Sequence, residues 1–321
     1  MGFFDLQVNG YAGVDLNAPG LTPGNLEEMC RKLEMDGVDE ILGTLITDSV
    51  SVMEARIKQL VRCRQESRIA QKMIRGIHLE GPFISPVDGY RGAHPLDAVI
   101  RADLDVARRL IDAGDGLVRI MTLAPESDQS MAVTRMLITN HVIVACGHSD
   151  ADMETLRKAV DAGLTMFTHL GNGCPSVMQR HDNIIQRALS LDQNLWFCFI
   201  ADGKHIPFFA LKNYVRLAGI DQVVLVTDAM AAAAAGPGNF TLGRWNIEVA
   251  DGGDARASDS SHFVGSTTTM RTGVNNLIHE LGLSPEDAHR MSSTNPRTVL
   301  GGVGRIQMAS HLLQTKPEHN K

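Results

Sequence analysis

The amino-acid sequence predicts an α/β fold, a (β/α)₈ barrel, and three observations support this prediction. Short apolar runs recur eight times along the chain, without the polar alternation that is typical of a half-exposed sheet. Longer amphipathic stretches separate these runs, as helices do when they cover both faces of a parallel sheet. Ionisable and amide side chains follow most of the runs directly, at the positions where a barrel carries its catalytic residues.

Predicted strands and helices alternate along most of the chain. The strands are expected at 3–8, 40–46, 73–79, 117–123, 142–147, 164–168, 195–200 and 222–227. The helices between them are expected at 23–36, about 50–71, 97–113, 127–139, 151–162, near 180–190, and 205–218. Thr22 is a suitable N-cap for the first helix, because Pro23 fits the first helical turn. Eight such units match the usual barrel length of about 250 residues.

An open, doubly wound sheet is the alternative fold for the same pattern. That fold usually carries a phosphate-binding turn, G-x-G-x-x-G, after its first strand. Residues 10–13 read Gly-Tyr-Ala-Gly and do not match this turn. The barrel is therefore the predicted fold.

A single domain is expected to occupy most of the chain. The barrel is predicted to span 1–305 and to include a hairpin at about 240–264, where a Gly/Asp turn separates two strand-like runs. Helices near 268–281 and 285–300 are expected to follow the hairpin. Residues 306–321 are predicted to form a polar tail that frays.

Composition and charge exclude several functional classes. Lys and Arg total 30 against 37 Asp and Glu, the net charge is -7, and no basic stripe marks a nucleic-acid interface. The five widely spaced cysteines include no C-x-x-C pair, which favours a reduced, cytoplasmic setting. The sequence contains neither a signal peptide nor an apolar run that could span a membrane, so no membrane partner is expected.

Polar residues at the predicted strand ends are expected to meet at one rim of the barrel. Gln7 and Asn9 end the first strand, and Glu80 ends the third. The later strands are followed by His148, His169, Asp202 and Asp228. Unrelated polar residues would scatter between the two rims, so this convergence indicates a catalytic site.

The chemistry of three rim residues suits a divalent cation. Glu80, His148 and His169 supply one carboxylate and two imidazoles, a ligand set that leaves a position open for water at catalytic zinc sites. Such a cation lowers the pKa of bound water to about 7. Asp228 would then serve as general base and return the proton to a leaving group.

Each residue also has a purely structural interpretation. A histidine at a strand end is commonly a hydrogen-bonded structural residue, and Asp228 could cap the chain after the last strand. Asp202-Gly203 is typical of a turn. The four residues with complementary ligand and base roles nevertheless favour a catalytic site over four independent structural residues.

These residues lie in strings that resemble one enzyme family. DLQVNG, HLEGPF, GHSDA, THLGNG, IADGKH, VTDAM and STNP occur in this order over about residues 3–305. The ordered set resembles the N-acetylglucosamine-6-phosphate deacetylases of the amidohydrolase superfamily. The resemblance implies a metal-dependent (β/α)₈ barrel, usually with a small β-sandwich, that removes acetate from a 6-phosphorylated amino sugar in the cytoplasm.

The resemblance also implies roles for individual residues. Glu80, His148 and His169 would hold the metal, Asp228 would be general base and then acid, and His94 in RGAHP would polarise the acetamide carbonyl. Gln7 and Asn9 replace the H-x-H of many amidohydrolases and are counted with the substrate contacts. Amides are poor zinc ligands, so one metal ion is expected, zinc first and ferrous iron as the alternative.

Substrate contacts follow from the same motifs. Arg180 in QRHDN and His205 match the family's phosphate contacts, and Asn172 with Gly173 matches the segment that grips the sugar. A guanidinium suits bidentate phosphate binding. Because this arginine can come from a neighbouring subunit in the family, a homodimer is implied.

Departures from the family pattern produce further expectations. The string Leu170-Gly171-Asn172-Gly173 lacks the usual bulky residue, so a looser sugar pocket is expected. The strings for most of the sandwich are missing, so this sandwich is expected to be largely absent. The alternatives are a related cyclic amidase or deaminase, and a catalytically silent sugar-phosphate-binding protein.

Overall fold

Eight parallel strands form the central sheet of the protein. The computed structural model describes residues 1–191, 195–257 and 262–301. The strands lie in the order β1 (Phe3–Val8), β4 (Val38–Ile46), β5 (Ile74–Glu80), β6 (Val118–Leu123), β7 (Ile143–Cys146), β8 (Met166–Phe167), β9 (Trp196–Ile200) and β10 (Val223–Val226). A parallel bridge between Val8 and Ala229 brings the last strand back to the first, so the sheet almost closes into a barrel. The predicted fold is confirmed.

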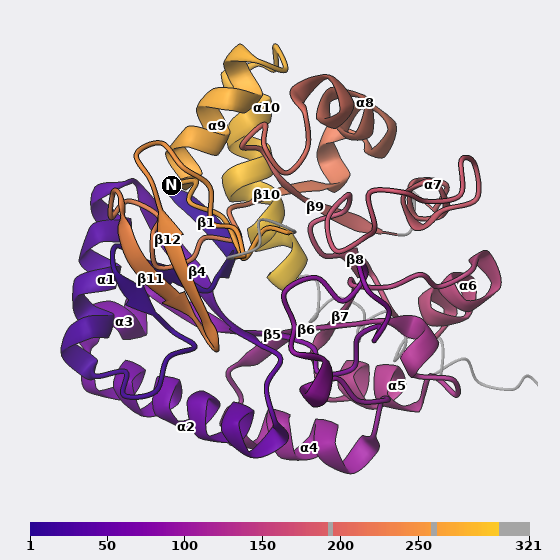
Figure 1. Ribbon diagram of the computed structural model, residues 1–321, viewed down its shortest axis with the longest axis horizontal. Coiled ribbons are helices and arrows are strands. Elements are labelled where there is room, and N and C mark those ends of the chain that lie inside the picture. The colour runs from indigo at the N-terminus through magenta and orange to yellow at the C-terminus, as the bar shows by residue number, and fades with distance from the viewer. Residues whose placement is uncertain (192–194, 258–261, 302–321) are drawn as a thin grey trace, which may run out of the picture.

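Helices surround this sheet (Figure 1). They are α1 (Pro23–Met35), α2 (Val50–Glu66), α3 (Arg68–Met73), α4 (Leu104–Ala113), α5 (Ala132–Thr139), α6 (Met153–Asp161), α7 (Ile184–Leu189), α8 (Phe208–Ala218), α9 (Met270–His279) and α10 (Pro285–His289). Single 3₁₀ turns lie at η1 (Leu96–Ala98), η2 (Pro125–Ser127) and η4 (Ile220–Gln222). None of the helices in the described part of the chain is long and apolar enough to cross a membrane.

Capping side chains decide where several helices begin. Thr22 accepts a hydrogen bond from the N–H of Asn25, which confirms the predicted start of α1. The helix expected over 50–71 is divided instead at Ser67, whose backbone is extended (φ -124, ψ 119). The Ser67 hydroxyl accepts the N–H of Ala70 and begins α3, because serine favours a cap over a helix interior. The helix expected from residue 97 begins only at Leu104, behind the Asp103 cap.

Two apolar layers hold the barrel together. Side chains of alternate strand positions fill the interior, as in other barrels of this size. The interior cluster comprises Phe4, Leu6, Leu42, Ile120, Ile143, Ala145, Met166, Cys198, Ile200, Val224, Val226 and Val299. A larger cluster packs the outer faces of the strands against the helices. Because both faces are covered, strands such as β7 and β10 are buried along their whole length.

The segment around the STNP string closes one end of the barrel. A π-helical turn, η5 (Arg290–Thr294), continues into a helical stretch at 295–301. Ser293 donates to the carbonyl of Gly2, just before β1, and Arg297 pairs with Glu40 in β4 at 2.8 Å. Asn295 donates to the carbonyls of Ile220 and Val223 at the start of β10. These contacts lie at the amino-terminal ends of the strands.

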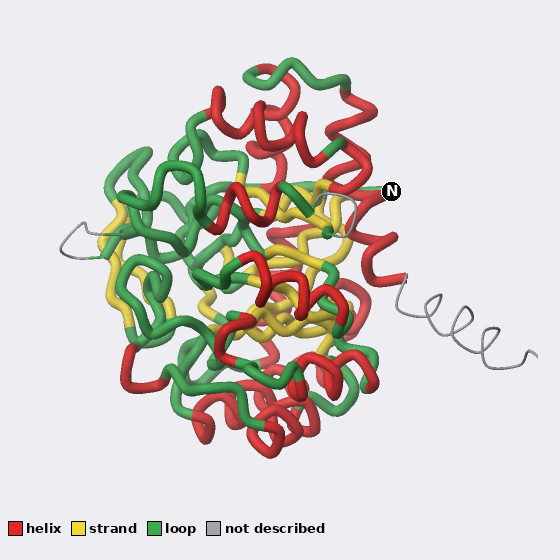
Figure 2. Tube along the Cα trace, turned by 90° about the vertical axis from the view of Figure 1, so that its right-hand side faces the viewer, coloured by secondary structure: helices red, strands yellow, loops and turns green. Residues whose placement is uncertain are grey.

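Long loops and a hairpin occupy the other end of the barrel (Figure 2). The hairpin joins β11 (Gly238–Leu242) to β12 (Trp245–Val249) through a turn at Gly243 and Arg244. The predicted Gly/Asp turn is thus wrong for this hairpin, because Asp251 and Gly252 follow β12 rather than separate its strands. A second small sheet pairs β2 (Gly10–Tyr11) with β3 (Val14–Asp15).

The two small sheets are the only sheets beside the barrel within the described ranges. The predicted tail at 306–321 lies outside the described residues.

We expect Asn295→Ala to destabilise the barrel by about 1–3 kcal/mol, the usual cost of leaving buried polar groups unpaired. The buried amide bridges two carbonyls, at 2.8 Å and 2.7 Å, that alanine cannot reach. Urea denaturation followed by circular dichroism measures the change in free energy of unfolding. Thr298→Ala is the matched control, because Thr298 is exposed on the same segment. Equal destabilisation by the two substitutions would contradict the bridging role.

Candidate active site

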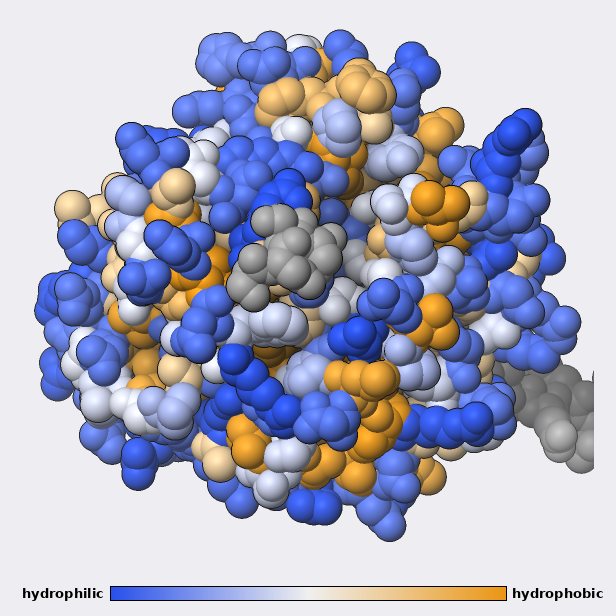
Figure 3. All heavy atoms as spheres, viewed as in Figure 1, coloured by the Kyte–Doolittle hydropathy of each residue, from blue (hydrophilic) through white to orange (hydrophobic). Residues whose placement is uncertain are grey.

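A cavity of about 640 Å³ opens at the carboxyl ends of the barrel strands. Most of the predicted site residues line it, namely Asn9, Glu80, His94, His148, His169, Asn172, Gly173, His205 and Asp228. The face that carries the hairpin is mostly hydrophilic, with separate apolar patches (Figure 3). The sequence pattern therefore located the cavity and most of its polar lining.

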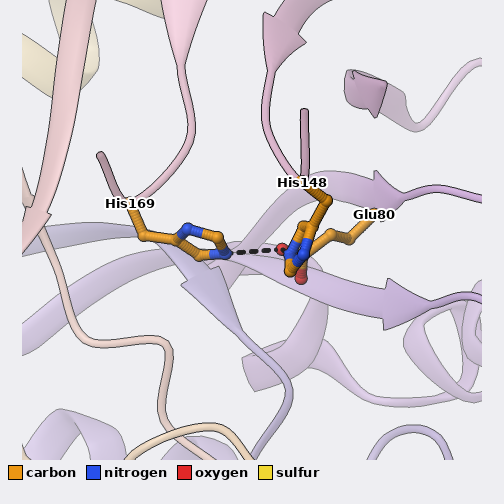
Figure 4. A group of neighbouring side chains, drawn as sticks. All are labelled: Glu80, His148 and His169. Carbon is orange, nitrogen blue, oxygen red and sulfur yellow. Dashed lines mark hydrogen bonds and ion pairs between the residues drawn. The ribbon is translucent and has the colours of Figure 1, made fainter. Parts of the chain in front are cut away.

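Three residues converge at the bottom of this cavity. Glu80 is the last residue of β5, while His148 and His169 each follow their strand, β7 and β8, by two residues. The Nε2 atoms of His148 and His169 lie 3.0 Å and 2.8 Å from the same oxygen, Oε1 of Glu80. Both imidazoles point toward the Glu80 carboxylate (Figure 4). The ligand atoms of these three residues all lie within 4.8 Å of one another.

This cluster fits a divalent cation. The Nδ1 atom of His148 lies 2.8 Å from the carbonyl oxygen of Tyr90, an acceptor for a proton on Nδ1 that would leave the Nε2 lone pair to a bound cation. Such an outer hydrogen bond is typical of metal-binding histidines. One carboxylate and two imidazoles match the ligand preferences of zinc and related ions. A cation between the three groups would replace the hydrogen bonds to Glu80 and bind one atom from each residue.

Charges within the cluster shift the pKa of its members. Burial acts to raise the pKa of Glu80, but hydrogen bonds from His148 and His169 outweigh burial and hold it well below its usual range. Burial, together with the neighbouring His148, lowers the pKa of His94 to about 3. His94 is therefore neutral at physiological pH and can share a proton in a hydrogen bond. Its Nε2 lies 3.2 Å from Nε2 of His148.

The backbone is left-handed at three of these residues. The φ angles are 52° at His148, 30° at His169 and 52° at Asp228. Residues other than glycine rarely adopt positive φ, and those that do concentrate at functional sites. Each of these residues lies two positions beyond its strand, so the same backbone turn recurs at three strand ends. This shared conformation is evidence for a functional site that is independent of the side-chain chemistry.

Asp228 is oriented by two amides. The Nε2 atom of Gln7 lies 3.0 Å, and Nδ2 of Asn9 lies 2.7 Å, from Oδ1 of Asp228. Gln7 also donates to Oε2 of Glu80 at 3.2 Å. The two amides thus hold Oδ1, which leaves Oδ2 as the oxygen available for proton transfer. Burial, reinforced by the negative charge of Glu80, raises the pKa of Asp228 to about 6.

Hydrogen bonds also fix the chain on both sides of Asp228. The hydroxyl of Thr227 donates to Oδ2 of the buried Asp5 and accepts the N–H of Ala229 at 3.0 Å. Ser266 donates its hydroxyl to the carbonyl of Thr227 at 2.6 Å and its N–H to the carbonyl of Asp228 at 2.8 Å. This network holds Asp228 in its left-handed conformation.

The hairpin clamps the loop that carries His94. Nε1 of Trp245 donates to the carbonyl of Ala93 at 2.6 Å, directly before His94. On the other side of His94, Arg244 binds both carboxylate oxygens of Asp97, at 3.0 Å and 2.9 Å. Arg244 also donates through Nε to the buried Asp48 at 3.0 Å. The same loop supplies the Tyr90 carbonyl that lies 2.8 Å from Nδ1 of His148.

The cavity is lined by three of the residues predicted to bind the sugar and its phosphate, namely Asn172, Gly173 and His205. Gly173 has a φ of 58°, and a Cβ atom there would lie 2.8 Å from Nδ1 of His148, so glycine permits a close approach. Nδ1 of His205 lies within hydrogen-bond distance of Oδ2 of Asp202, at 2.6 Å. Arg180 is exposed and does not line the cavity of this chain.

Several residues of this site carried no recognisable signal in the sequence. Tyr90 acts through its backbone carbonyl, which no sequence motif identifies. Arg244 and Trp245 reach the site from the hairpin, more than 140 residues from their partners. Arg256, which also lines the cavity, lies in a segment without a catalytic motif. Only the hairpin pattern at about 240–264 pointed to this part of the chain.

Known proteins are similar to this chain in both sequence and fold. No protein-family model matches the chain. It is 34% identical over 307 residues to the N-acetylglucosamine-6-phosphate deacetylase of Bos taurus, covering 94% of this chain and 74% of the relative. It is 31% identical over 303 residues to the N-acetylgalactosamine-6-phosphate deacetylase of Escherichia coli O157:H7, covering 94% of this chain and 78% of the relative.

A solved structure extends the likeness to three dimensions. It is a mutant of the N-acetyl-D-glucosamine-6-phosphate deacetylase of Mycobacterium smegmatis, in complex with N-acetyl-D-glucosamine-6-phosphate. Its TM-score with this protein is 0.85 at 30% identity, over 94% of this chain and 77% of that one. The identities and the share of each chain covered confirm the resemblance inferred from the motifs. The chain belongs to the N-acetylglucosamine-6-phosphate deacetylase family.

Proposed function

We propose that the protein is a metal-dependent hydrolase that removes acetate from N-acetylglucosamine-6-phosphate or a closely related 6-phosphorylated N-acetyl amino sugar. One observation carries this proposal: Glu80, His148 and His169 converge beside Asp228 in one cavity. A cation-binding cluster next to an oriented carboxylate is the arrangement that amide hydrolysis requires. The names of the relatives indicate the same reaction.

A metal ion would be held by Glu80, His148 and His169. When bound, a divalent cation supplies Lewis-acid chemistry, which polarises the amide carbonyl and makes water more acidic. Zinc suits the donor set, with ferrous iron as the alternative. Gln7 and Asn9 turn their N–H groups toward Asp228, so they orient the base rather than bind a second cation.

Asp228 transfers the protons, and His94 stabilises the negative charge that develops on the carbonyl oxygen. Asp228 takes a proton from the attacking water through Oδ2, and the water oxygen bonds to the carbonyl carbon. Neutral His94 donates a hydrogen bond to the carbonyl oxygen as negative charge develops there. Asp228 then transfers the proton to the nitrogen, the C–N bond breaks, and acetate and the amino sugar phosphate are the products.

Substrate binding is proposed to use further residues that line the cavity. Asn172 and the backbone at Gly173 are proposed to contact the sugar, and His205 its phosphate. Arg180 does not line the cavity of this chain, and it is proposed to contact the phosphate bound in a second subunit of a homodimer. The side chain of nearby Val177 is 87% exposed, as an apolar residue at such an interface would be in an isolated chain. A cytoplasmic location remains a prediction.

We expect the metal-loaded protein to release acetate from a 6-phosphorylated N-acetyl hexosamine and much less from its unphosphorylated form. Acetate is measured with the glucosamine and galactosamine epimers, each with and without the 6-phosphate. A chelator should abolish release, and added Zn²⁺ or Fe²⁺ should restore it, because Glu80 and the imidazoles need the cation. Equal activity without the phosphate would favour another amidohydrolase, and no activity with bound metal would favour a silent binding protein.

Asp228→Asn should lower kcat by about 10²–10⁴-fold, the usual contribution of general acid–base catalysis. Asparagine keeps the shape of the side chain but cannot accept the proton. Metal content by atomic emission should stay at the wild-type level, since Asp228 is not in the metal cluster. Near-wild-type turnover in this variant would refute the assigned role.

Trp245→Phe should lower kcat roughly 10-fold with a smaller change in KM, because small displacements of a catalytic group are costly. The substitution keeps an aromatic ring but removes the hydrogen bond to Ala93. Trp196→Phe, the same change on β9, is the matched control and should leave kcat unchanged. In a His94→Ala background, Trp245→Phe should have no further effect. Additive losses in the double variant would show that Trp245 does not act through His94.

A further inference from the structure

The charges around the cavity offer a substrate phosphate few cationic partners in the same chain. Three carboxylates line the cavity, those of Glu80, Asp88 and Asp228. Arg180 is exposed and absent from the lining. Among the described residues that line the cavity, Arg256 is the only lysine or arginine. A phosphate group in this cavity would meet one permanent cation of its own chain.

Arg256 is held against the wall that carries His205. The Cζ atom of its guanidinium lies 4.0 Å from the centre of the Phe263 ring. The Phe263 ring in turn stacks on His205, with ring centres 4.2 Å apart and an angle of 29° between the planes. An antiparallel bridge pairs Arg256 with Phe263, so backbone and side-chain contacts fix the same two residues. Phe263 thus connects the arginine rigidly to His205.

The charge of Arg256 is only partly balanced by its ion pair. Its Nε lies 3.5 Å from Oδ2 of Asp254, a long distance for a charge-assisted hydrogen bond. Asp254 also pairs with Lys204 through its other oxygen, so one carboxylate serves two cations. The Arg256 side chain is 41% exposed. Stacking on an aromatic face leaves the edge of a guanidinium able to donate hydrogen bonds.

We infer that Arg256 is a specificity-determining residue, which binds the phosphate group of the substrate together with His205 in the same subunit. This inference rests on the proposed deacetylation of a 6-phosphorylated sugar. It adds a cation from the chain that also supplies Asp228, whereas Arg180 would act from a second subunit. The phosphate lies far from the reacting amide, so this contact supplies binding energy rather than catalysis.

Steady-state kinetics of Arg256→Gln test this inference. KM for the phosphorylated substrate should rise roughly 10-fold or more, the effect of losing a hydrogen bond to a charged group, while kcat stays nearly constant. Activity toward the unphosphorylated sugar should not change. Arg256→Lys keeps the charge and should recover part of the loss. Arg109→Gln is the matched control, because Arg109 pairs with Glu54 on the helical exterior at 2.8 Å.

Inorganic phosphate provides a second readout that does not depend on turnover. Isothermal titration should give wild-type protein a measurable affinity for phosphate, and Arg256→Gln should weaken it by a similar factor. Unchanged KM and phosphate affinity in Arg256→Gln would overturn the inference, as would an equal loss on both forms of the sugar. Wild-type protein that ignores the 6-phosphate would instead refute the proposed substrate, and the titration would still decide whether Arg256 binds phosphate.

Discussion

The burial of the Glu80 carboxylate is the constraint on which the site depends. An ionised carboxylate in an apolar barrel is unfavourable unless positive charge or hydrogen-bond donors compensate it. Glu80 ends a strand whose other residues are mostly buried, so solvent cannot supply these partners. The compensation comes from His148, His169 and Gln7, each from a different strand end. The geometry that makes the carboxylate tolerable is also one that suits a divalent cation.

The barrel brings these partners to Glu80 because its parallel strands all end at the same rim. Parallel strands end at one rim, and a left-handed residue two positions beyond β7, β8 and β10 places each functional side chain in the cavity. The strain of these conformations is offset by hydrogen bonds behind the rim, such as those from Ser266 around Asp228. The opposite end of the barrel is closed separately by the segment around Asn295. The contacts that close the barrel thus lie at one end of the strands, and the candidate active-site residues lie at the other end.

The sequence predicted those features that depend on local periodicity or on position at a strand end. Glu80, His148, His169 and Asp228 could be placed because the end of an apolar run can be seen in the sequence itself. The contacts of Trp245 with Ala93 and of Arg244 with Asp97 could not be predicted, because periodicity does not show which distant loops meet. The positive φ of His148 escaped prediction as well, since histidine gives no signal for that conformation as glycine does. The division of the helix at Ser67 depended on a cap that competes with the helix interior.

The charges that line the cavity limit where a phosphate group could bind. Two carboxylates, Glu80 and Asp228, lie close enough for the charge of Glu80 to raise the pKa of Asp228 to about 6. A phosphate placed beside them would be repelled, and its own charge would raise that pKa further. At the proposed position beside His205 and Arg256, the guanidinium would offset part of the charge of a phosphate.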